Sequence, residues 1–173
     1  MTLIATGAFI KIPLPFISVT LQTFMTTLAG MVLGPKRGAT ACLLYMAVGL
    51  IGLPIFTMGG GPAYVFQPTF GYILGFAAGA ALTGIICEKF SSEGFFKYFI
   101  AALSGIAVVY LIGIVYYCAL KNIYYGDAMA GADIMKYLIL APLPGDILTC
   151  VGCAAIGARL KNSISPLFGS KKQ

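Results

Sequence analysis

The chain of 173 residues is 60% hydrophobic and only 9% charged, and its eleven basic and five acidic side chains give a net charge of +6. Soluble domains carry about 25% charged residues, so this composition excludes a water-soluble globule and indicates an all-α integral membrane protein with lipid as its solvent. The positive charge predicts basic cytoplasmic loops rather than a nucleic-acid partner.

Six apolar segments predict six transmembrane helices in a single transmembrane domain over residues 1–173. Their expected ranges are about 1–12, 20–34, 38–53, 70–87, 95–120 and 139–160. A span needs about 20 residues at about 1.5 Å per residue. The first segment is too short, so we expect either a start placed late or a helix that begins before Met1. Small residues four apart, such as Gly75 and Gly79, predict close helix contacts.

The basic side chains are unevenly distributed among the connections. Eight of the eleven lie in the turn 34–38, the segment 88–97 and the tail from residue 159, whereas the other side of the bundle has only Lys11, Lys121 and Lys136. The positive-inside rule places the richer side in the cytoplasm. Six spans put both termini on one side, so we expect both termini to be cytoplasmic.

The sequence offers little for catalysis or metal binding. All five cysteines lie in or beside apolar segments, and there is no histidine. We interpret the cysteines as packing residues, including Cys150 and Cys153 with their CxxC spacing. The chain has no GxxxxGK[ST], HExxH or GxSxG motif. We therefore expect no enzyme activity and no cofactor or metal, and any ATP-driven step would need partner subunits.

Asp146 stands alone in the otherwise uncharged stretch "LILAPLPGDILTCVGCAAIG". A charge at membrane depth costs about 3 kcal/mol or more, which makes such a residue a functional candidate. Pro142, Pro144 and Gly145 precede it and predict a broken helix. Asp146 could then cap the following half-helix, contact a ligand, or do both with its two oxygens.

The stretch "GGGPAYVFQPTFGYILGF", residues 59–76, begins as a loop rich in glycine and proline and ends as a helix. The glycines let the backbone pass close to another group, and the prolines fix φ. A loop of this length and folded character predicts a lid over or beside a pocket. Its tyrosines could instead belong to an interfacial aromatic belt, an interpretation that suits residues 116–125 better.

Four motifs, "GAFIKIPLPFISVTLQTF", "GPKRGATACLLYMAVGLIGLPIF", "GGGPAYVFQPTFGYILGF" and "PLPGDIL", follow one another in order. Together they resemble the BioY family, the biotin-specific S components of energy-coupling factor (ECF) transporters, over about residues 7–159. The resemblance implies a six-helix bundle in the prokaryotic cytoplasmic membrane that captures biotin from outside. It also implies partners: a membrane coupling subunit, EcfT, and two ABC-type ATPase subunits that drive release.

The resemblance implies a set of binding residues. Asp146 matches the family's "PGD" motif and would accept the ureido N–H pair of biotin, while Gln22 and backbone N–H groups near Gly60 and Gly61 would serve the ureido carbonyl. The thiophane ring and valeryl chain suit aromatic side chains. The substrate-binding candidates are Asp146, Gln22, Tyr45, Gly60, Gly61, Tyr64, Gln67 and Lys11, with Phe16 and Phe66 as further apolar contacts.

The chain departs from the family pattern at three places. No arginine lies on the outer side, so Lys11, Lys121, Lys136 or a tyrosine must bind the carboxylate, and we prefer Lys11 because it adjoins the "IPLP" loop. The coupling interface on the first helix would include Ala5 and Ala8, but Met1 occupies the earlier place of the alanine pattern. Thr149 stands where many members have a basic residue. The alternatives are an S component or solitary carrier for another small vitamin, or a membrane scaffold.

Overall fold

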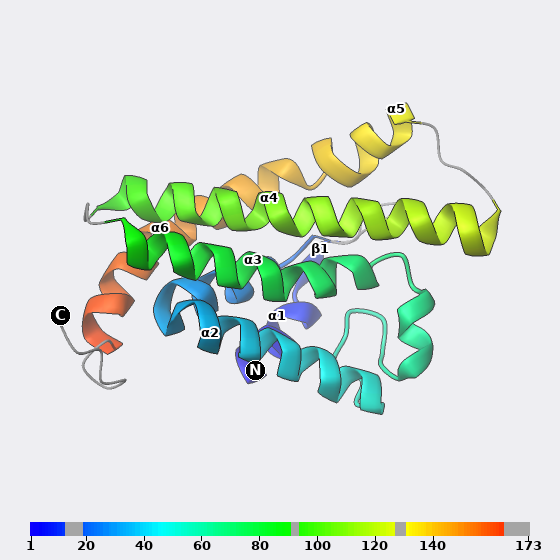
Figure 1. Cartoon of the computed structure of the whole chain (residues 1–173), viewed down its shortest axis with the longest axis horizontal. Coiled ribbons are helices and arrows are strands. Elements are labelled where there is room, and N and C mark those ends of the chain that lie inside the picture. Colours follow the sequence, from blue (N-terminus) through cyan, green and yellow to red (C-terminus); the bar gives the residue numbers. More distant parts are fainter. Residues whose placement is uncertain (13–18, 91–93, 127–130, 165–173) are drawn as a thin grey trace.

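The computed structural model describes residues 1–12, 19–90, 94–126 and 131–164, which are mainly helical. The α-helices are α1 (Thr2–Phe9), α2 (Gln22–Ile51), α3 (Phe70–Lys89), α4 (Phe95–Leu120), α5 (Gly131–Asp133) and α6 (Leu143–Ile164). A 3-10 helix, η1 (Pro62–Phe66), and two π-helical segments, η2 (Lys121–Tyr125) and η3 (Ile134–Leu140), complete the helical elements. Strands β1 (Lys11–Ile12) and β2 (Val19–Thr20) pair antiparallel. Helices α2, α3 and α4 lie side by side, and η3 and α6 run behind them (Figure 1).

Helix α2 consists of two arms that fold back on each other. Gly34 has φ 81° and ψ 176° inside it, a conformation that an L side chain rarely adopts. Pro35 follows at the start of the second arm, where its missing N–H is not needed. A Cβ at Gly38 would lie 2.8 Å from the Gly30 Cα, which shows how closely the arms approach. The arms take the place of the two helices expected over 20–34 and 38–53, as Figure 1 shows.

Helix α3 packs between α2 and α4 through backbone contacts that only glycine permits. A Cβ at Gly84 would lie 2.5 Å from the Pro35 nitrogen, and one at Gly79 would lie 2.7 Å from the Gly105 oxygen. At Gly75 the nearest atom would be the Val109 Cα, at 2.9 Å. The small-residue spacing thus produces close helix contacts, as the sequence predicted.

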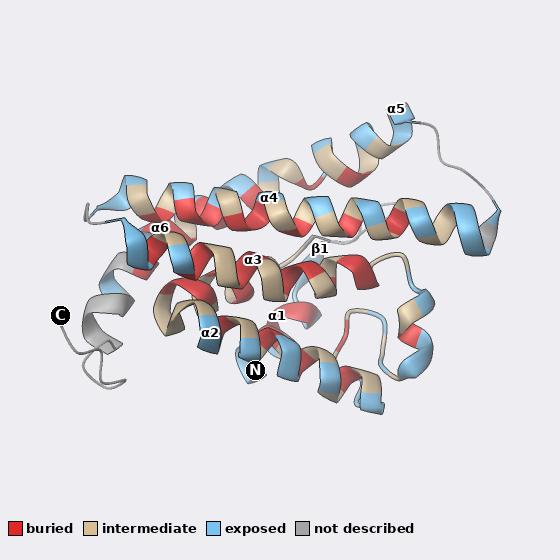
Figure 2. Cartoon of the chain, viewed as in Figure 1, coloured by how far each residue is buried: buried red, intermediate tan, exposed pale blue. Residues whose placement is uncertain are grey.

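The outward sides of the helices are apolar, as lipid requires. Leu111 of α4 is 65% exposed and Leu148 of α6 is 72% exposed, while α3 is buried along much of its length (Figure 2). Three helices are long and apolar enough to cross a membrane, over Phe70–Lys89, Phe95–Tyr124 and Ile134–Gly157. The expectation of a helical membrane protein with several apolar spans is confirmed.

Two bounds differ from expectation in ways that matter for the site. The first helix, expected over 1–12, ends at Phe9, because Lys11 and Ile12 pair with β2 instead. The last helix, expected over 139–160, is preceded by a π-helical turn closed by the Ala141 N–H and the Lys136 oxygen. Pro142 and Pro144 follow this turn at the start of α6, so they do not interrupt a hydrogen-bonded helix interior.

Two hydrophobic clusters form the interior. The first is largely aromatic and gathers around Tyr45, Phe56, Tyr64 and Phe70 near η1. The second contains Met31, Tyr98 and three buried cysteines that form no disulfide, Cys87, Cys150 and Cys153. The cavity described next borders both clusters, with Ile73 and Phe76 from the first and Ile106 from the second.

Candidate ligand-binding site

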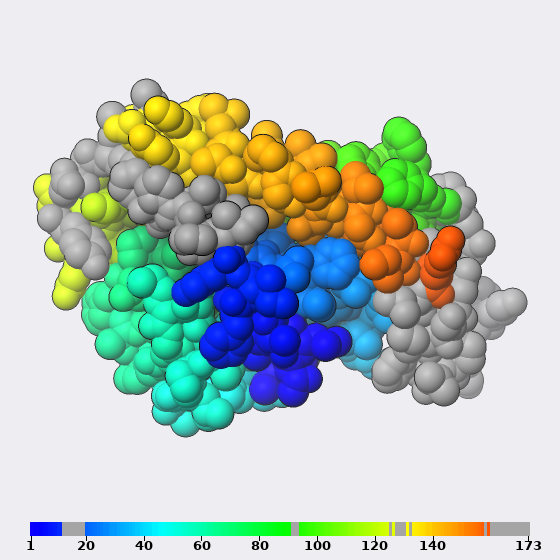
Figure 3. Space-filling model, turned by 180° about the vertical axis from the view of Figure 1, so that it is seen from behind, coloured from blue at the N-terminus to red at the C-terminus, as the bar shows by residue number. Residues whose placement is uncertain are grey.

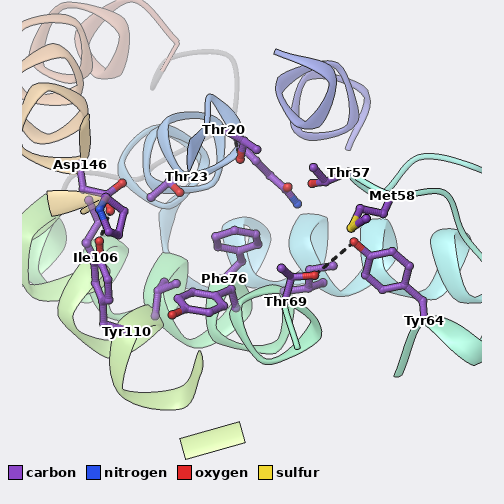
Figure 4. A pocket seen from close by; sticks show the side chains of 15 residues that line it. Thr20, Thr23, Thr57, Met58, Tyr64, Thr69, Phe76, Ile106, Tyr110 and Asp146 are labelled. Carbon is purple, nitrogen blue, oxygen red and sulfur yellow. Dashed lines mark hydrogen bonds between the residues drawn. The ribbon is translucent and has the colours of Figure 1, made fainter. Parts of the chain in front are cut away.

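A cavity of about 730 Å³, counting the space at its open mouth, lies between α2, α3, α4 and the beginning of α6. Small-molecule sites commonly measure about 300–1,000 Å³. The lining residues are Thr20, Gln22, Thr23, Thr57, Met58, Tyr64, Thr69, Tyr72, Ile73, Phe76, Ile106, Val109, Tyr110, Pro142 and Asp146. Figure 4 shows an elongated site, with Asp146 and Tyr110 at one end and Thr57, Met58 and Tyr64 at the other. Asp146 is the only charged residue of this lining.

Asp146 lies in the first turn of α6 and is only 8% exposed. Its backbone N–H donates to the Pro142 oxygen at 3.1 Å, as in a regular helix. Its Oδ2 accepts a hydrogen bond from the hydroxyl of Tyr110 on α4. The predicted helix-capping role is therefore wrong: α6 begins at Leu143, so Asp146 is past the cap position, and its side chain reaches across to α4.

Two buried polar atoms in the described part of the chain have no hydrogen-bond partner, and both belong to residues that line the cavity. They are the Nε2 of Gln22 and the hydroxyl oxygen of Tyr72. Gln22 is only 3% exposed. Leaving a buried polar group unpaired costs about 1–3 kcal/mol. Two such groups in one cavity indicate that a polar ligand completes their hydrogen bonds.

The far end of the cavity is lined by hydroxyl groups. The Tyr64 hydroxyl lies 3.4 Å from the Thr69 Oγ1 (Figure 4). The Tyr64 ring packs on Phe56 with centroids 4.5 Å apart. Lys11 does not line the cavity, but its Nζ donates to the backbone oxygen of Thr57 at 3.0 Å. β1 is thus connected to the rim at Thr57, and Lys11 is the basic side chain that the structure places beside this end of the site.

The glycine-rich loop approaches the end of α2 rather than the cavity. The Gly61 N–H donates to the Gly49 oxygen at 2.8 Å, and a Cβ at Gly60 would lie 2.1 Å from the Leu53 oxygen. Neither glycine lines the cavity. The prediction that their N–H groups meet the ligand is therefore contradicted at Gly61, because that donor already has a partner.

The predicted lid, residues 59–68, forms part of the cavity wall. Within it Tyr64 lines the site, while the Tyr116 hydroxyl of α4 donates to the backbone oxygen of Val65. The Phe66 ring packs at a tilt against the Tyr124 ring, with centroids 4.9 Å apart. The segment is thus attached to both α2 and α4, and these contacts favour a fixed wall over a freely moving lid.

Several predicted contacts lie away from the cavity. Tyr45 is 1% exposed in the aromatic cluster behind it, with its hydroxyl donating to the Ile55 oxygen at 2.9 Å. Gln67 and Phe66 are exposed and do not line the site. Phe16 falls outside the described residues. The sequence therefore selected several aromatic and polar residues that the fold uses for packing or leaves on the surface.

The alanines expected at a coupling interface differ in exposure. Ala8 is 0% exposed, since it is packed inside the chain, whereas Ala5 retains some exposed surface. In this conformation Ala8 cannot contact a partner, which contradicts its predicted role. Figure 3 shows α1 and β1, in dark blue, at the surface of the molecule. The outward residues of α1 include Leu3 and Phe9, which are 65% and 62% exposed.

Sequence reasoning missed Tyr110, the hydrogen-bond partner of Asp146. The position of Tyr110 within its segment could have indicated a role in the site. It lies in the middle of the apolar segment 95–120, too far from either end for an interfacial belt. It also missed the threonines that line the site, Thr20, Thr23 and Thr57. Threonines in apolar helices commonly bond to their own backbone, as Thr26 does with Thr23, so their type alone carries no signal.

Comparison with known proteins identifies the class first. The structure resembles a crystal structure of the S-component for biotin from an ECF-type ABC transporter, with a TM-score of 0.78 and 28% identity, over 93% of this chain and 86% of that one. A fold match of this extent indicates a helical S component of such a transporter.

The family model for BioY matches residues 1–166. A probable biotin transporter BioY of Lysinibacillus sphaericus is 35% identical, covering 91% of this chain and 81% of that protein. The biotin transporter BioY of Thermotoga maritima is also 35% identical, covering 92% and 89%. The chain therefore belongs to the BioY family, and the expectation from the four sequence motifs is confirmed.

Proposed function

We propose that this chain captures biotin outside the cell as the substrate-binding S component of an ECF-type ABC transporter. It is a multi-pass membrane component of a transporter family, not an enzyme family. The observation that carries the proposal is the cavity itself: a buried carboxylate at one end, hydroxyl groups at the other and apolar side chains between them.

The chemistry of biotin matches this order of groups. Asp146 accepts from an N–H of the cyclic urea, since its Oδ2 is held by Tyr110 and its other oxygen remains available. Ile73, Phe76 and Val109 provide the apolar surface for the fused ring and the valeryl chain. The carboxylate of the ligand then reaches the Thr57 end, where Lys11 exchanges its bond to the Thr57 oxygen for one to the ligand.

The arrangement in the membrane follows from the charge distribution. The turn at Gly34, the end of α3 and the start of α4 lie together at one end of the bundle and carry Lys36, Arg37, Lys89 and Lys97. This end faces the cytoplasm. The two arms of α2 count as separate passes, and α1, whose 8 residues are too few to span alone, marks the first of six segments. Six segments put both termini in the cytoplasm. The cavity then opens to the outside.

Partner subunits supply the energy, because the sequence has no nucleotide-binding motif of its own. A membrane coupling subunit, EcfT, docks on the chain, and two ABC-type ATPases drive release of biotin into the cell. Ala5 and the exposed residues of α1 form part of the docking surface. Reconstituted vesicles should show ATP-dependent biotin uptake only with all subunits present.

Equilibrium binding of labelled biotin to the full chain, purified in detergent, tests the central proposal. We expect saturable binding at one site per chain, displaced by unlabelled biotin and not by unrelated vitamins. Thermal unfolding of the same preparation establishes that the protein is folded. A folded chain without saturable biotin binding contradicts the proposal, and selective displacement by another vitamin assigns the chain to that ligand instead.

The topology has its own test. The variants Ala63→Cys and Lys36→Cys place thiols at exposed positions at opposite ends of the bundle. A membrane-impermeant maleimide added to intact cells should label only Ala63→Cys, and Lys36→Cys should react only after permeabilisation. The chain without either substitution measures background from its five cysteines. Labelling of Lys36→Cys in intact cells overturns the assignment.

A further inference from the structure

The Asp146 end of the cavity contains a hydrogen-bond donor without an assigned role. The hydroxyl of Tyr72 is buried and has no partner, and Tyr72 lines the cavity. A tyrosine hydroxyl normally finds a partner when it is buried. A ligand that fills the cavity is the simplest source of the missing acceptor.

The packing around Tyr72 places its ring beside Tyr110, the hydrogen-bond partner of Asp146. The Tyr72 ring meets the Tyr110 ring edge-on, with centroids 6.2 Å apart and planes at 81°, and Tyr110 in turn bonds to Asp146. On the other side, a Cβ at Gly113 would lie 2.7 Å from the Tyr72 Cδ1, so the ring rests directly on the backbone of α4. A donor and an acceptor are thus held in one part of the site.

The other unpartnered donor, Gln22, belongs to a different part of the cavity. Its backbone N–H donates to the Thr20 Oγ1 at 3.3 Å, and Figure 4 shows Thr20 nearer to Thr57 than to Asp146. This places the Gln22 amide toward the Thr57 end. Tyr72 is therefore the better placed of the two to act together with Asp146.

A cyclic urea presents a matching pair of groups along each edge. Its carbonyl and each neighbouring N–H point to the same side of the ring, so one edge offers an acceptor beside a donor. To bind both groups of such an edge, a protein needs a hydrogen-bond donor beside an acceptor. A carboxylate alone binds only the N–H and leaves the carbonyl without a donor. Asp146 supplies the acceptor, and the remaining requirement is a donor beside it.

We propose that Tyr72 contacts the ligand directly and donates its hydroxyl hydrogen to the carbonyl of the cyclic urea, while Asp146 accepts from the adjacent N–H. Tyr110 is a positioning residue that holds Oδ2 of Asp146 and leaves the other oxygen for the ligand. This inference rests on biotin as the ligand. It transfers the carbonyl contact from Gln22 and the loop glycines to Tyr72, and it makes Tyr72 a determinant of specificity for a urea oxygen.

The variant Tyr72→Phe tests the inference because it removes only the unpartnered oxygen. Loss of an unsatisfied buried group leaves the folded protein equally or more stable. We expect an unchanged or higher Tm without ligand, together with about tenfold weaker biotin binding, the loss typical of one hydrogen bond inside a site. Tyr98→Phe makes the same change at a buried tyrosine outside the cavity and should leave the affinity for biotin unchanged.

Ligand analogues separate a hydrogen bond from a change in cavity shape. Dethiobiotin keeps the cyclic urea and should lose affinity in Tyr72→Phe by the same factor as biotin. 2-Thiobiotin replaces the carbonyl oxygen by sulfur, a weak acceptor, so its affinity should change less than about twofold. All three ligands can be measured by competition against labelled biotin.

Unchanged biotin affinity in Tyr72→Phe overturns the inference and leaves biotin capture intact. Equal losses for biotin and 2-thiobiotin also overturn it, because the hydroxyl then acts on cavity shape and not on the carbonyl. If the folded wild-type chain binds no biotin, the proposed function itself fails, and the two failures are thereby distinguished.

Discussion

The two halves of helix α3 differ in what they contribute: the first half lines the cavity, and the second half only packs against neighbouring helices. Its first half contributes Tyr72, Ile73 and Phe76 to the cavity, and leaves a buried hydroxyl without a partner. Its second half, from Gly79 to Gly84, packs so closely that a single Cβ would collide with α2 or α4. We call the part of the bundle around the first half of α3, with Asp146 of α6, the cavity half. The part around Gly79 to Gly84 is the packed half.

The difference shows where this small protein places its stability and its function. In lipid, helices associate through close packing, because lipid is as apolar as their side chains. The packed half provides that association. The cavity half also packs closely on α4 through Gly71 and Gly75, but it lines the cavity with a buried hydroxyl that has no partner. Such a group is favourable only when a ligand completes its hydrogen bonds. Substitutions in the two halves should therefore affect different measurements, affinity in one case and unfolding in the other.

The largest expected effect is that of Asp146→Ala in the cavity half. Removing a carboxylate that bonds to the ligand should weaken biotin binding by about 100-fold, as expected for a charged hydrogen bond. Tm should change little, since the lost protein contact is the single bond from Tyr110. Equilibrium binding and thermal unfolding of one preparation measure both quantities.

Asp146→Asn is the matched control for charge. It keeps the shape and one acceptor oxygen, so its loss of affinity should be smaller, about tenfold. If Asp146→Ala binds biotin as tightly as the wild type, the assignment of the polar end of the site is wrong and the comparison between the halves loses its basis.

In the packed half, Gly84→Ala should lower the stability of the protein and leave its affinity for biotin nearly unchanged, the opposite of Asp146→Ala. Its Cβ would lie 2.5 Å from the backbone nitrogen of Pro35, so α2 and α3 must move apart. Such overpacking costs about 1–3 kcal/mol in free energy of unfolding, seen as a lower Tm in detergent. Biotin affinity of the folded protein should stay within about twofold, since Gly84 does not line the cavity.

Gly131→Ala is the matched control, because it adds the same methyl group where, apart from the chain neighbours, no atom of the described residues lies within 4 Å. It should leave Tm unchanged or raise it slightly through better helix propensity. Equal Tm values for the two variants would show that the glycine contacts of α3 do not hold the bundle together.

The sequence revealed the close helix packing better than the cavity. Glycines four residues apart on apolar helices carry a direct structural meaning, and Gly75 and Gly79 do pack as that spacing predicts. Asp146 was found because a charge in an apolar span is costly, and it does line the cavity. Its partner Tyr110 depends on how α4 and α6 face each other, which periodicity does not specify.

The outer loop shows the limit of composition as evidence. Glycine indicates that something comes close, but not what, and here Gly60 passes the Leu53 oxygen at the end of α2. The first helix shows the same limit: α1 ends at Phe9 and β1 then pairs with β2, a strand contact that the apolar run of the first segment does not reveal. Tyr45 is polar and aromatic, yet its hydroxyl finds the Ile55 oxygen within the core.

A smaller effect is expected of Lys11→Met at the cavity's other end. The change keeps the length of the side chain and removes the charge, and with it the bond to the Thr57 oxygen. If Lys11 turns to the ligand's carboxylate, biotin binding should weaken about fivefold, the size expected for a partly exposed ion pair. The affinity for biotin methyl ester should not change, because the ester has no charge to lose. Equal losses for acid and ester would show that Lys11 only supports the rim.

The smallest effect is expected of Tyr64→Phe, which tests whether residues 59–68 are a wall or a lid. The change removes only the long 3.4 Å contact with Thr69 and keeps the ring on Phe56. A wall held by Gly49 and Tyr116 should release biotin at nearly the wild-type rate, within about twofold. Tyr64→Ala also removes the ring that lines the cavity, and should speed release more. A rise of tenfold or more in the release rate for Tyr64→Phe, measured by dilution of labelled biotin, would show that the loop opens and that the Tyr64 hydroxyl keeps it closed. Residues 59–68 would then be a lid that moves over the cavity and controls how fast biotin leaves it.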